Sequence, residues 1–184
     1  IQPLLAVNPQ EIAQVVPMLS DTFGFDDIIM EQPLMEIPME LFERRRFQYS
    51  AQGLLELVSR AGKGRNRISL GVIEADIYHP GLNFVFGLAR PGEAAVISLC
   101  RLRPEYYGPR ADAELFRMRV VKEASHELGH VLGLDHCRSF SCVMFFSNSI
   151  ADTDRKSHEF CRSCKERLSS SESHSNGNLR RIQR

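Results

Sequence analysis

Two histidines and a glutamate near residue 130 have a spacing that suits metal chemistry. His126 and His130 lie four residues apart, so on an α-helix their rings are offset by only about 40° and can reach one ion. Glu127 follows His126 directly, which places a carboxylate beside the ion rather than on it. A carboxylate in that position can act as a general base on a water molecule.

A third ligand is expected six residues after His130. Gly133 can adopt a positive φ, end the helix and turn the chain back, which brings His136 to the same ion. Three protein ligands leave one position for water, as in a catalytic zinc site. The spacing therefore predicts a zinc hydrolase centre. The alternatives are partly exposed histidines beside a salt-bridging glutamate, or a metal site without activity.

Four of the five cysteines follow the third histidine closely. Cys137 and Cys142 form one pair, and Cys161 and Cys164 form a second. Four thiolates in two pairs favour a closed tetrahedral zinc site, whose binding energy would help to fold this segment. The competing interpretation is two disulfides, or a redox pair formed by Cys161 and Cys164. Cys100 ends an apolar strand and is interpreted as a small buried hydrophobic residue.

Composition and charge narrow the function classes. The 184 residues include 23 Lys plus Arg and 23 Asp plus Glu, so the net charge is zero and offers no support for a nucleic-acid partner. The run Arg44–Arg46 is interpreted as a solvated face. No apolar run approaches the roughly 20 residues of a membrane span, and residues Ile1–Val7 carry no export signature, so a cytoplasmic location is expected. A monomer is also expected.

Apolar periodicity predicts a strand-rich block before the helix that carries the histidines. Gly62–Gly64 and Arg90–Glu93 are expected to be turns, the second joining two strands into a hairpin. Strands are expected at residues 1–7, 34–37, 67–75, 83–88 and 94–99, and helices at 9–23, 51–61, 112–132 and 154–168. The motif helix therefore follows a sheet in the chain.

The metal-binding motifs resemble those of the archaemetzincins, metallopeptidases of the metzincin clan. The resemblance covers the run 126–137, the segment Cys142-Val143-Met144 and the segment Cys161-Arg162-Ser163-Cys164. It implies two zinc ions: a catalytic one held by His126, His130 and His136 with Glu127 as the base, and a structural one held by Cys137, Cys142, Cys161 and Cys164. It also implies that Met144 forms the Met-turn beneath the catalytic metal. On sequence grounds alone, Met144 could equally be a core methionine.

The expected fold class is α/β (α+β), a zincin-like domain with a mixed twisted sheet, an active-site helix and a four-cysteine zinc subdomain. We expect a catalytic domain over 1–136, a zinc-stapled subdomain carrying the Met-turn over 137–168, and a polar, flexible tail over 169–184. The strand Ala94–Leu99 is the candidate rim for an extended peptide. Its alternative is an internal strand paired on both edges.

The predicted function is zinc-dependent hydrolysis of peptide bonds in a peptide or protein substrate, without nucleic acid or membrane partners. Glu127 would accept a proton from water and pass it to the leaving amine. The alternative is a binding module without activity, in which the four-cysteine element and the basic residues Arg180, Arg181 and Arg184 engage nucleic acid or a protein. A catalytically idle relative that keeps its zinc is a third interpretation.

Overall fold

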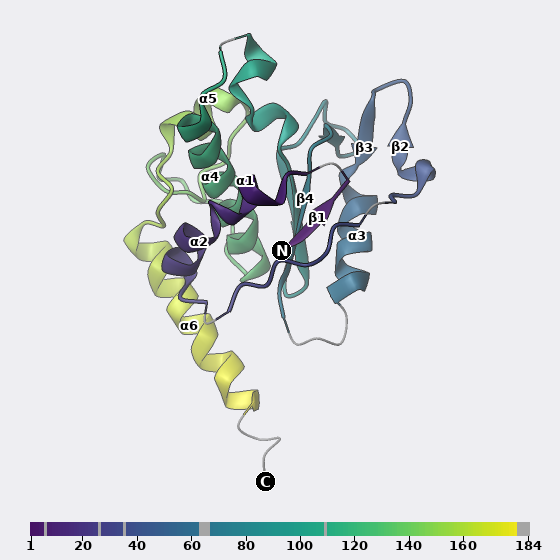
Figure 1. Ribbon diagram of the computed structural model, residues 1–184. Helices are drawn as coiled ribbons and strands as arrows, with labels where there is room; N and C mark the ends of the chain where they lie inside the picture. The colour runs from purple at the N-terminus through teal and green to yellow at the C-terminus, as the bar shows by residue number, and fades with distance from the viewer. Residues whose placement is uncertain (6, 26, 35, 63–66, 109, 180–184) are drawn as a thin grey trace.

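A four-stranded mixed sheet forms the centre of the protein (Figure 1). This computed structural model describes residues 1–179 apart from 6, 26, 35, 63–66 and 109. For residues 171–179 it describes the backbone only. The strands β1 (Gln2–Leu4), β4 (Ser69–Ile73) and β7 (Ala94–Ser98) run parallel, and β6 (Gly87–Arg90) runs antiparallel to β7. The order β1-β4-β7-β6 confirms the predicted mixed sheet.

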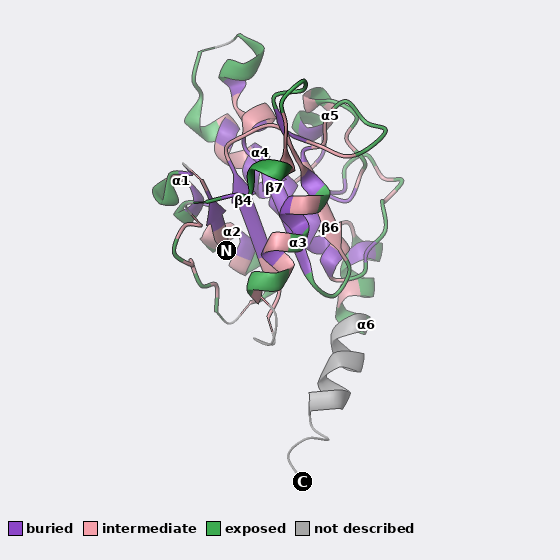
Figure 2. Cartoon of the chain, turned by 90° about the vertical axis from the view of Figure 1, so that its right-hand side faces the viewer, coloured by how far each residue is buried: buried purple, intermediate pink, exposed green. Residues whose placement is uncertain are grey.

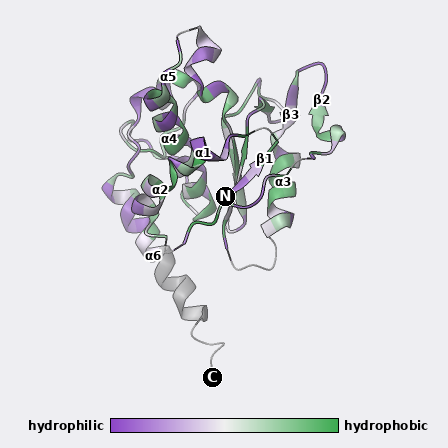
Figure 3. Cartoon of the chain, in the orientation of Figure 1, coloured by the Kyte–Doolittle hydropathy of each residue, from purple (hydrophilic) through white to green (hydrophobic). Residues whose placement is uncertain are grey.

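Helices cover both faces of this sheet. On one face α3 (Ala51–Gly62) packs through Leu54, Leu55 and Val58. On the other face lie α4 (Ala113–Val131) and the short helices α1 (Pro9–Ala13) and α2 (Val16–Phe23). Buried residues, purple in Figure 2, fill the sheet and the inner sides of these helices. Hydrophobic residues, green in Figure 3, gather where the helices meet the sheet. The apolar faces of the helices therefore pack against both faces of the sheet.

A second, smaller sheet projects from the first. Its strands β2 (Phe42–Glu43), β3 (Gln48–Ser50) and β5 (Ile77–Tyr78) lie in that order, and none of the three was predicted. Three short 3-10 helices complete the fold before α4, namely η1 (Met39–Leu41), η2 (Cys100–Leu102) and η3 (Pro104–Tyr107). Within the described ranges, no helix is both long and apolar enough to cross a bilayer.

The long helix α4 starts and ends where the sequence predicts. The Asp112 side chain accepts a hydrogen bond from the Leu115 backbone N–H at 2.9 Å, which caps the first turn. Gly133 has φ 88°, so the chain reverses directly after the helix. Twelve of its 19 residues are buried, because α4 is enclosed by the sheet and by the C-terminal segments. Side chains on α4 therefore have fixed positions.

Two predicted helices are each divided in the structure. The helix expected over 9–23 separates into α1 and α2, because Pro17 lacks a backbone N–H and stands in the first turn of α2. The helix expected over 154–168 is replaced by α5 (Ile150–Arg155) and α6 (Arg162–Leu179). Between them Lys156 is extended, with ψ 154°, and its side chain is buried beside α4. Three residues of the predicted tail, Arg180, Arg181 and Arg184, lie outside the described residues.

The hypothesis that Ala94–Leu99 forms an open rim is wrong. The strand β7 pairs with β4 on one side and with β6 on the other, so its backbone groups are used on both edges. The alternative interpretation, an internal strand, is confirmed. The terminal strand on this side of the sheet is β6, which forms the predicted hairpin with β7.

Candidate metal centres

Three imidazole rings converge at the C-terminal end of α4. The Nε2 atoms of His126 and His130 are 3.2 Å apart, and the ring of His136 lies 4.7 Å from the ring of His130 and 5.3 Å from that of His126. All three ligand atoms lie within 4.8 Å of one another. With zinc–nitrogen bonds of about 2.0–2.1 Å, nitrogen ligands at tetrahedral corners stand about 3.3 Å apart. The spacing of the first pair fits one zinc ion.

Backbone carbonyl groups fix the orientation of two of these rings. The Nδ1 atom of His126 donates to the Val143 carbonyl at 2.8 Å, and that of His130 donates to the Leu134 carbonyl at 2.7 Å. Because a carbonyl only accepts, each Nδ1 carries the proton and each Nε2 offers a lone pair. Burial and the nearby Lys156 ammonium lower the pKa of His126 to about 2. Burial also lowers the pKa of His130 and His136, so neutral, ligand-competent rings are favoured.

The turn after α4 presents His136 at the surface. Gly133 N–H donates to the His130 carbonyl at 3.0 Å and Leu134 N–H to the Gly129 carbonyl at 2.9 Å, which closes the end of the helix. His136 is exposed, whereas His126 is buried and His130 is intermediate. The exposed ring of Phe146 stands 4.8 Å from the ring of His136. The ligand set is therefore reached by solvent from the side of His136.

Glu127 is buried between α4 and the first residue of β6. A Cβ atom placed on Gly87 would lie 2.6 Å from Cγ and 2.8 Å from Oε1 of Glu127, so only glycine leaves this side chain its place. Burial, and then the like charge of Glu123, raise the pKa of Glu127 well above the usual carboxyl value. A carboxylate held close to the histidines with a raised proton affinity suits a general base.

Met144 is buried beneath the histidine helix. A Cβ atom on Gly129 would lie 2.4 Å from Sδ of Met144 and 3.2 Å from a ring carbon of Phe160. Gly129 lies between the two histidines of the helix, so the thioether packs directly below the ligand pair. The backbone N–H of Val143 donates to the Glu159 carbonyl at 2.9 Å, which fixes the segment that carries Met144.

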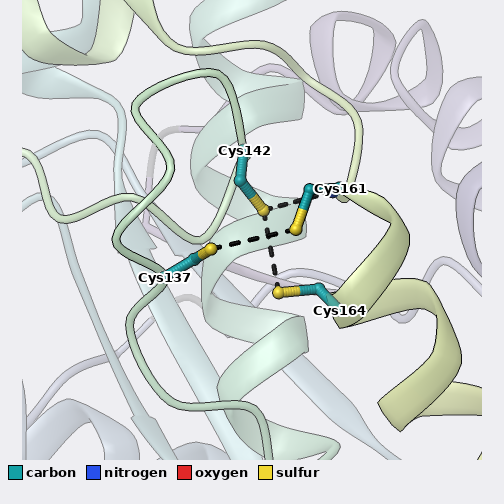
Figure 4. A group of neighbouring side chains, drawn as sticks. All are labelled: Cys137, Cys142, Cys161 and Cys164. Carbon is teal, nitrogen blue, oxygen red and sulfur yellow. Dashed lines mark hydrogen bonds between the residues drawn. The ribbon is translucent and has the colours of Figure 1, made fainter.

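The four predicted cysteines come together at the start of α6. Figure 4 shows their sulfur atoms facing one another. The Sγ atoms of Cys137 and Cys161 are 3.8 Å apart, as are those of Cys142 and Cys164. Zinc–sulfur bonds of about 2.3 Å place tetrahedral ligands about 3.8 Å apart. All five cysteines, each within the described residues, are free, so the disulfide interpretation is wrong for this structure.

Two of these thiols are tuned in opposite directions. The backbone N–H of Cys164 is the main factor that lowers the pKa of Cys161 to about 7, whereas burial raises the pKa of Cys164 to about 12. The N–H of Cys161 also donates to Cys142 Sγ at 3.3 Å, and that of Ser139 to Cys137 Sγ at 3.4 Å. Such N–H groups stabilise the thiolate form that a metal requires.

Three residues beside Glu127 were not predicted from the sequence. Glu123 lies one helical turn before it on α4, a spacing that could have been noticed. Gly87 and Lys156 approach from β6 and from the end of α5. Both residues lie far from the histidine motif in the sequence, so no spacing or periodicity in the sequence links them to Glu127.

The fold and the ligand set together define a class. A long helix beneath a mixed sheet, three converging imidazoles and an adjacent carboxylate are the features of a zincin-like metallohydrolase. Comparison with known proteins narrows this class to one family.

The model of the family described as "Peptidase family M54" matches residues 33–170. An archaemetzincin of Pyrococcus horikoshii is 51% identical over 129 residues, which cover 69% of this chain and 69% of the relative. The crystal structure of the archaemetzincin from Methanopyrus kandleri covers 94% of this chain and 96% of its own, with 37% identity and a TM-score of 0.79. A structure called a zinc-dependent peptidase, from Methanocorpusculum labreanum, covers 91% of this chain and 100% of its own, with 29% identity and a TM-score of 0.76.

The chain belongs to peptidase family M54, the family of the archaemetzincins. The predicted family, fold class and enzyme class, a metallopeptidase, are confirmed, and its substrate is a peptide. The family does not favour the alternative of a binding module without activity.

Proposed function

We propose that this protein hydrolyses peptide bonds at a zinc ion held by His126, His130 and His136, with Glu127 as the general base. The observation that supports this most directly is the convergence of three ring nitrogens within 4.8 Å beside a buried carboxylate. When bound, zinc lowers the pKa of water and polarises the carbonyl group of the scissile bond.

The chain's own residues supply the proton steps. Glu127 takes a proton from the attacking water and then gives it to the leaving amine. The carbonyls of Val143 and Leu134 hold the rings of His126 and His130 in the tautomer that offers Nε2. Met144 fills the space below Gly129, so that the helix keeps one position relative to the segment that follows.

We infer that an extended peptide binds along β6. This strand ends the order β1-β4-β7-β6, and its first residue, Gly87, contacts Glu127. Strand addition at a sheet edge supplies backbone hydrogen bonds that do not depend on sequence. A peptide on β6 would therefore pass next to the proposed base.

A second zinc ion, bound by Cys137, Cys142, Cys161 and Cys164, has a structural role. It joins the segment after His136 to the start of α6, where Leu134, Val143 and Phe160 form a small core. Four protein ligands leave no open position, so this site is closed to substrate. The proposed division is a catalytic part, 1–136, a zinc-stapled part, 137–168, and a polar tail, 169–184, although α6 continues across the last boundary to Leu179.

We further propose that the protein acts without nucleic acid, since its formal charges balance to zero and give no basic surface field. A monomer is part of the same proposal. Four free thiols gathered in one cluster suit a reducing compartment such as the cytoplasm.

The substitution Glu127→Gln tests the proposal. It removes the base while keeping the size of the side chain, so cleavage of a mixed peptide library should fall by about 10²- to 10⁴-fold at unchanged zinc content. Glu114→Gln is the control, because Glu114 lies exposed on the same helix and pairs only with Arg117 among described residues. Equal hydrolysis by the Glu127 variant and the wild type would contradict the role of Glu127.

A further inference from the structure

Two exposed tyrosines stand side by side in the 3-10 helix η3, which follows β7. Tyr106 and Tyr107 are 45% and 43% exposed, and their ring centres are 5.0 Å apart in an edge-to-face contact. The end of η3 is closed by Gly108, whose φ is 95° and whose N–H donates to the Glu105 carbonyl at 3.2 Å. Single exposed apolar side chains are common on proteins, whereas neighbouring aromatic rings held at a surface are typical of binding sites.

Arg101 holds these rings against Phe84. Its guanidinium carbon lies 4.1 Å from the ring centre of Phe84 and 4.9 Å from that of Tyr106. The hydroxyl group of Tyr107 donates to the Arg101 carbonyl at 3.0 Å. Nε and a terminal nitrogen of Arg101 donate to the two carboxylate oxygens of Asp76, both at 2.8 Å. This bidentate pair fixes the guanidinium and balances its charge, so the rings present a rigid surface without net charge.

Phe84, Tyr106 and Tyr107, here called the aromatic patch, continue the edge formed by β6. Phe84 precedes Gly87 by three positions, so their Cα atoms are at most about 10 Å apart. Gly87 contacts Glu127, and Phe84 packs against the core cluster to which α4 contributes, so both lie on the α4 face of the sheet. A peptide strand advances about 3.3 Å per residue. A side chain about three to five residues from the scissile bond would therefore reach the aromatic patch.

We propose that the aromatic patch is a substrate subsite that selects an aromatic or other large apolar side chain at that distance from the scissile bond. This rests on the proposed function, in which a peptide lies along β6 beside Glu127. Because Asp76 balances the charge of Arg101, the patch has no unpaired cation for a substrate carboxylate, whereas its rings offer faces and edges to another ring. The rings are held in place before the peptide binds, which lowers the entropic cost of binding.

Peptides that carry one phenylalanine at successive positions test this subsite. In a peptide of about twelve Ala and Ser residues, Phe in place of Ser three to five residues from the scissile bond should raise kcat/KM of the zinc-loaded protein about tenfold. Tyr106→Ser should reduce this preference to within about twofold by raising KM at unchanged kcat, and Tyr106→Phe should retain it. An undiminished preference in the Tyr106→Ser variant, or no preference at these positions in the wild type, would overturn the inference.

Ile29→Ser is the matched control for the kinetic measurement. Ile29 is 56% exposed, but its carbonyl accepts a hydrogen bond from the nitrogen of Ile1, next to β1 and thus at the other end of the sheet from β6. Loss of an exposed apolar side chain there should leave the preference for phenylalanine unchanged. A loss as large as that of Tyr106→Ser would contradict an effect specific to the aromatic patch.

Binding to the Glu127→Gln variant separates this inference from the proposed function. The zinc-loaded variant should bind the preferred Phe peptide about tenfold more tightly than its Ser counterpart, and an added Tyr106→Ser change should abolish that difference. Fluorescence anisotropy of labelled peptides measures the two Kd values. Equal Kd values for the two peptides would overturn the subsite. Failure of the proposed function has a different signature, since Glu127→Gln would then be as active as the wild type while the difference in Kd remains.

Discussion

Gly87 shows how a residue without a side chain shapes the site. Its contact with Glu127 joins a strand to the metal-binding helix, and the pair is 40 positions apart in the chain. The ligands and the base could be predicted because each set follows a local spacing: helical for the histidines, paired for the cysteines. Gly87 and Lys156 were missed because their contacts arise only where separate elements meet, whereas Glu123 lies one helical turn before Glu127, a spacing that the sequence does show.

The substitution Gly87→Ala should displace the carboxyl group of Glu127. The added Cβ would approach Cγ to 2.6 Å, so the side chain must rotate away from its position. We expect kcat to fall about 100-fold, as for a misplacement of about 1 Å, while zinc content stays the same.

Gly53→Ala is the matched control for this measurement. Its Cβ would meet Cδ2 of Leu41 at 2.4 Å, but that atom is the flexible end of a side chain on the opposite face of the sheet. Wild-type kcat in the Gly87 variant would show that Glu127 does not depend on this clearance.

At the scale of elements, the sequence predicted structure best where pairing is local. The hairpin of β6 and β7 was expected from one turn between two apolar runs. The strands β2, β3 and β5 have two or three residues each, which is too short for a periodic signal. The break between α5 and α6 depends on the burial of Lys156 against α4, a tertiary contact that helical periodicity does not report.

An ion pair between α4 and α5 holds that junction in place. Arg119 is buried and donates through Nε and one terminal nitrogen to Asp154, both at 2.7 Å, and donates to the Leu102 carbonyl at 3.1 Å. Arg119→Ala should lower the free energy of unfolding by about 2 kcal/mol, since it leaves a partly buried carboxylate and a carbonyl without their partner.

Urea unfolding measures this loss, with Arg117→Ala as the comparison. Arg117 pairs with the exposed Glu114 on the same helix, so its replacement should leave the midpoint nearly unchanged. Equal midpoints for the two variants would show that the α4–α5 pair contributes nothing.

At the scale of the whole molecule, the two candidate centres share one segment. His136 and Cys137 are adjacent, and the N–H of Cys137 donates to the Met144 carbonyl at 2.9 Å. His136, a ligand of one proposed zinc, is thus bonded to Cys137, a ligand of the other. Cys137 in turn is hydrogen-bonded to Met144, which lies below the histidines. The run from His126 to Cys137 is better understood as a bridge between two metal centres than as a self-contained motif.

Loss of the thiolate site should therefore reduce catalysis at a distance. Cys164→Ser removes one of four ligands, and with the second zinc absent we expect kcat to fall at least about tenfold, since the support of His136 is weakened. Peptide cleavage at saturating substrate measures this, with Cys100→Ser as the control because Cys100 lies outside the four-thiol cluster. Full activity after loss of the thiolate-bound metal would show that the two centres are independent.

Zinc stoichiometry tests the central claim most directly. Metal analysis of the purified protein should give about two zinc ions per chain, about one after His130→Ala and about one after Cys142→Ser, with a lower Tm only in the cysteine variant. A single zinc in the wild type, or two in either variant, would contradict the assignment of one catalytic and one structural centre.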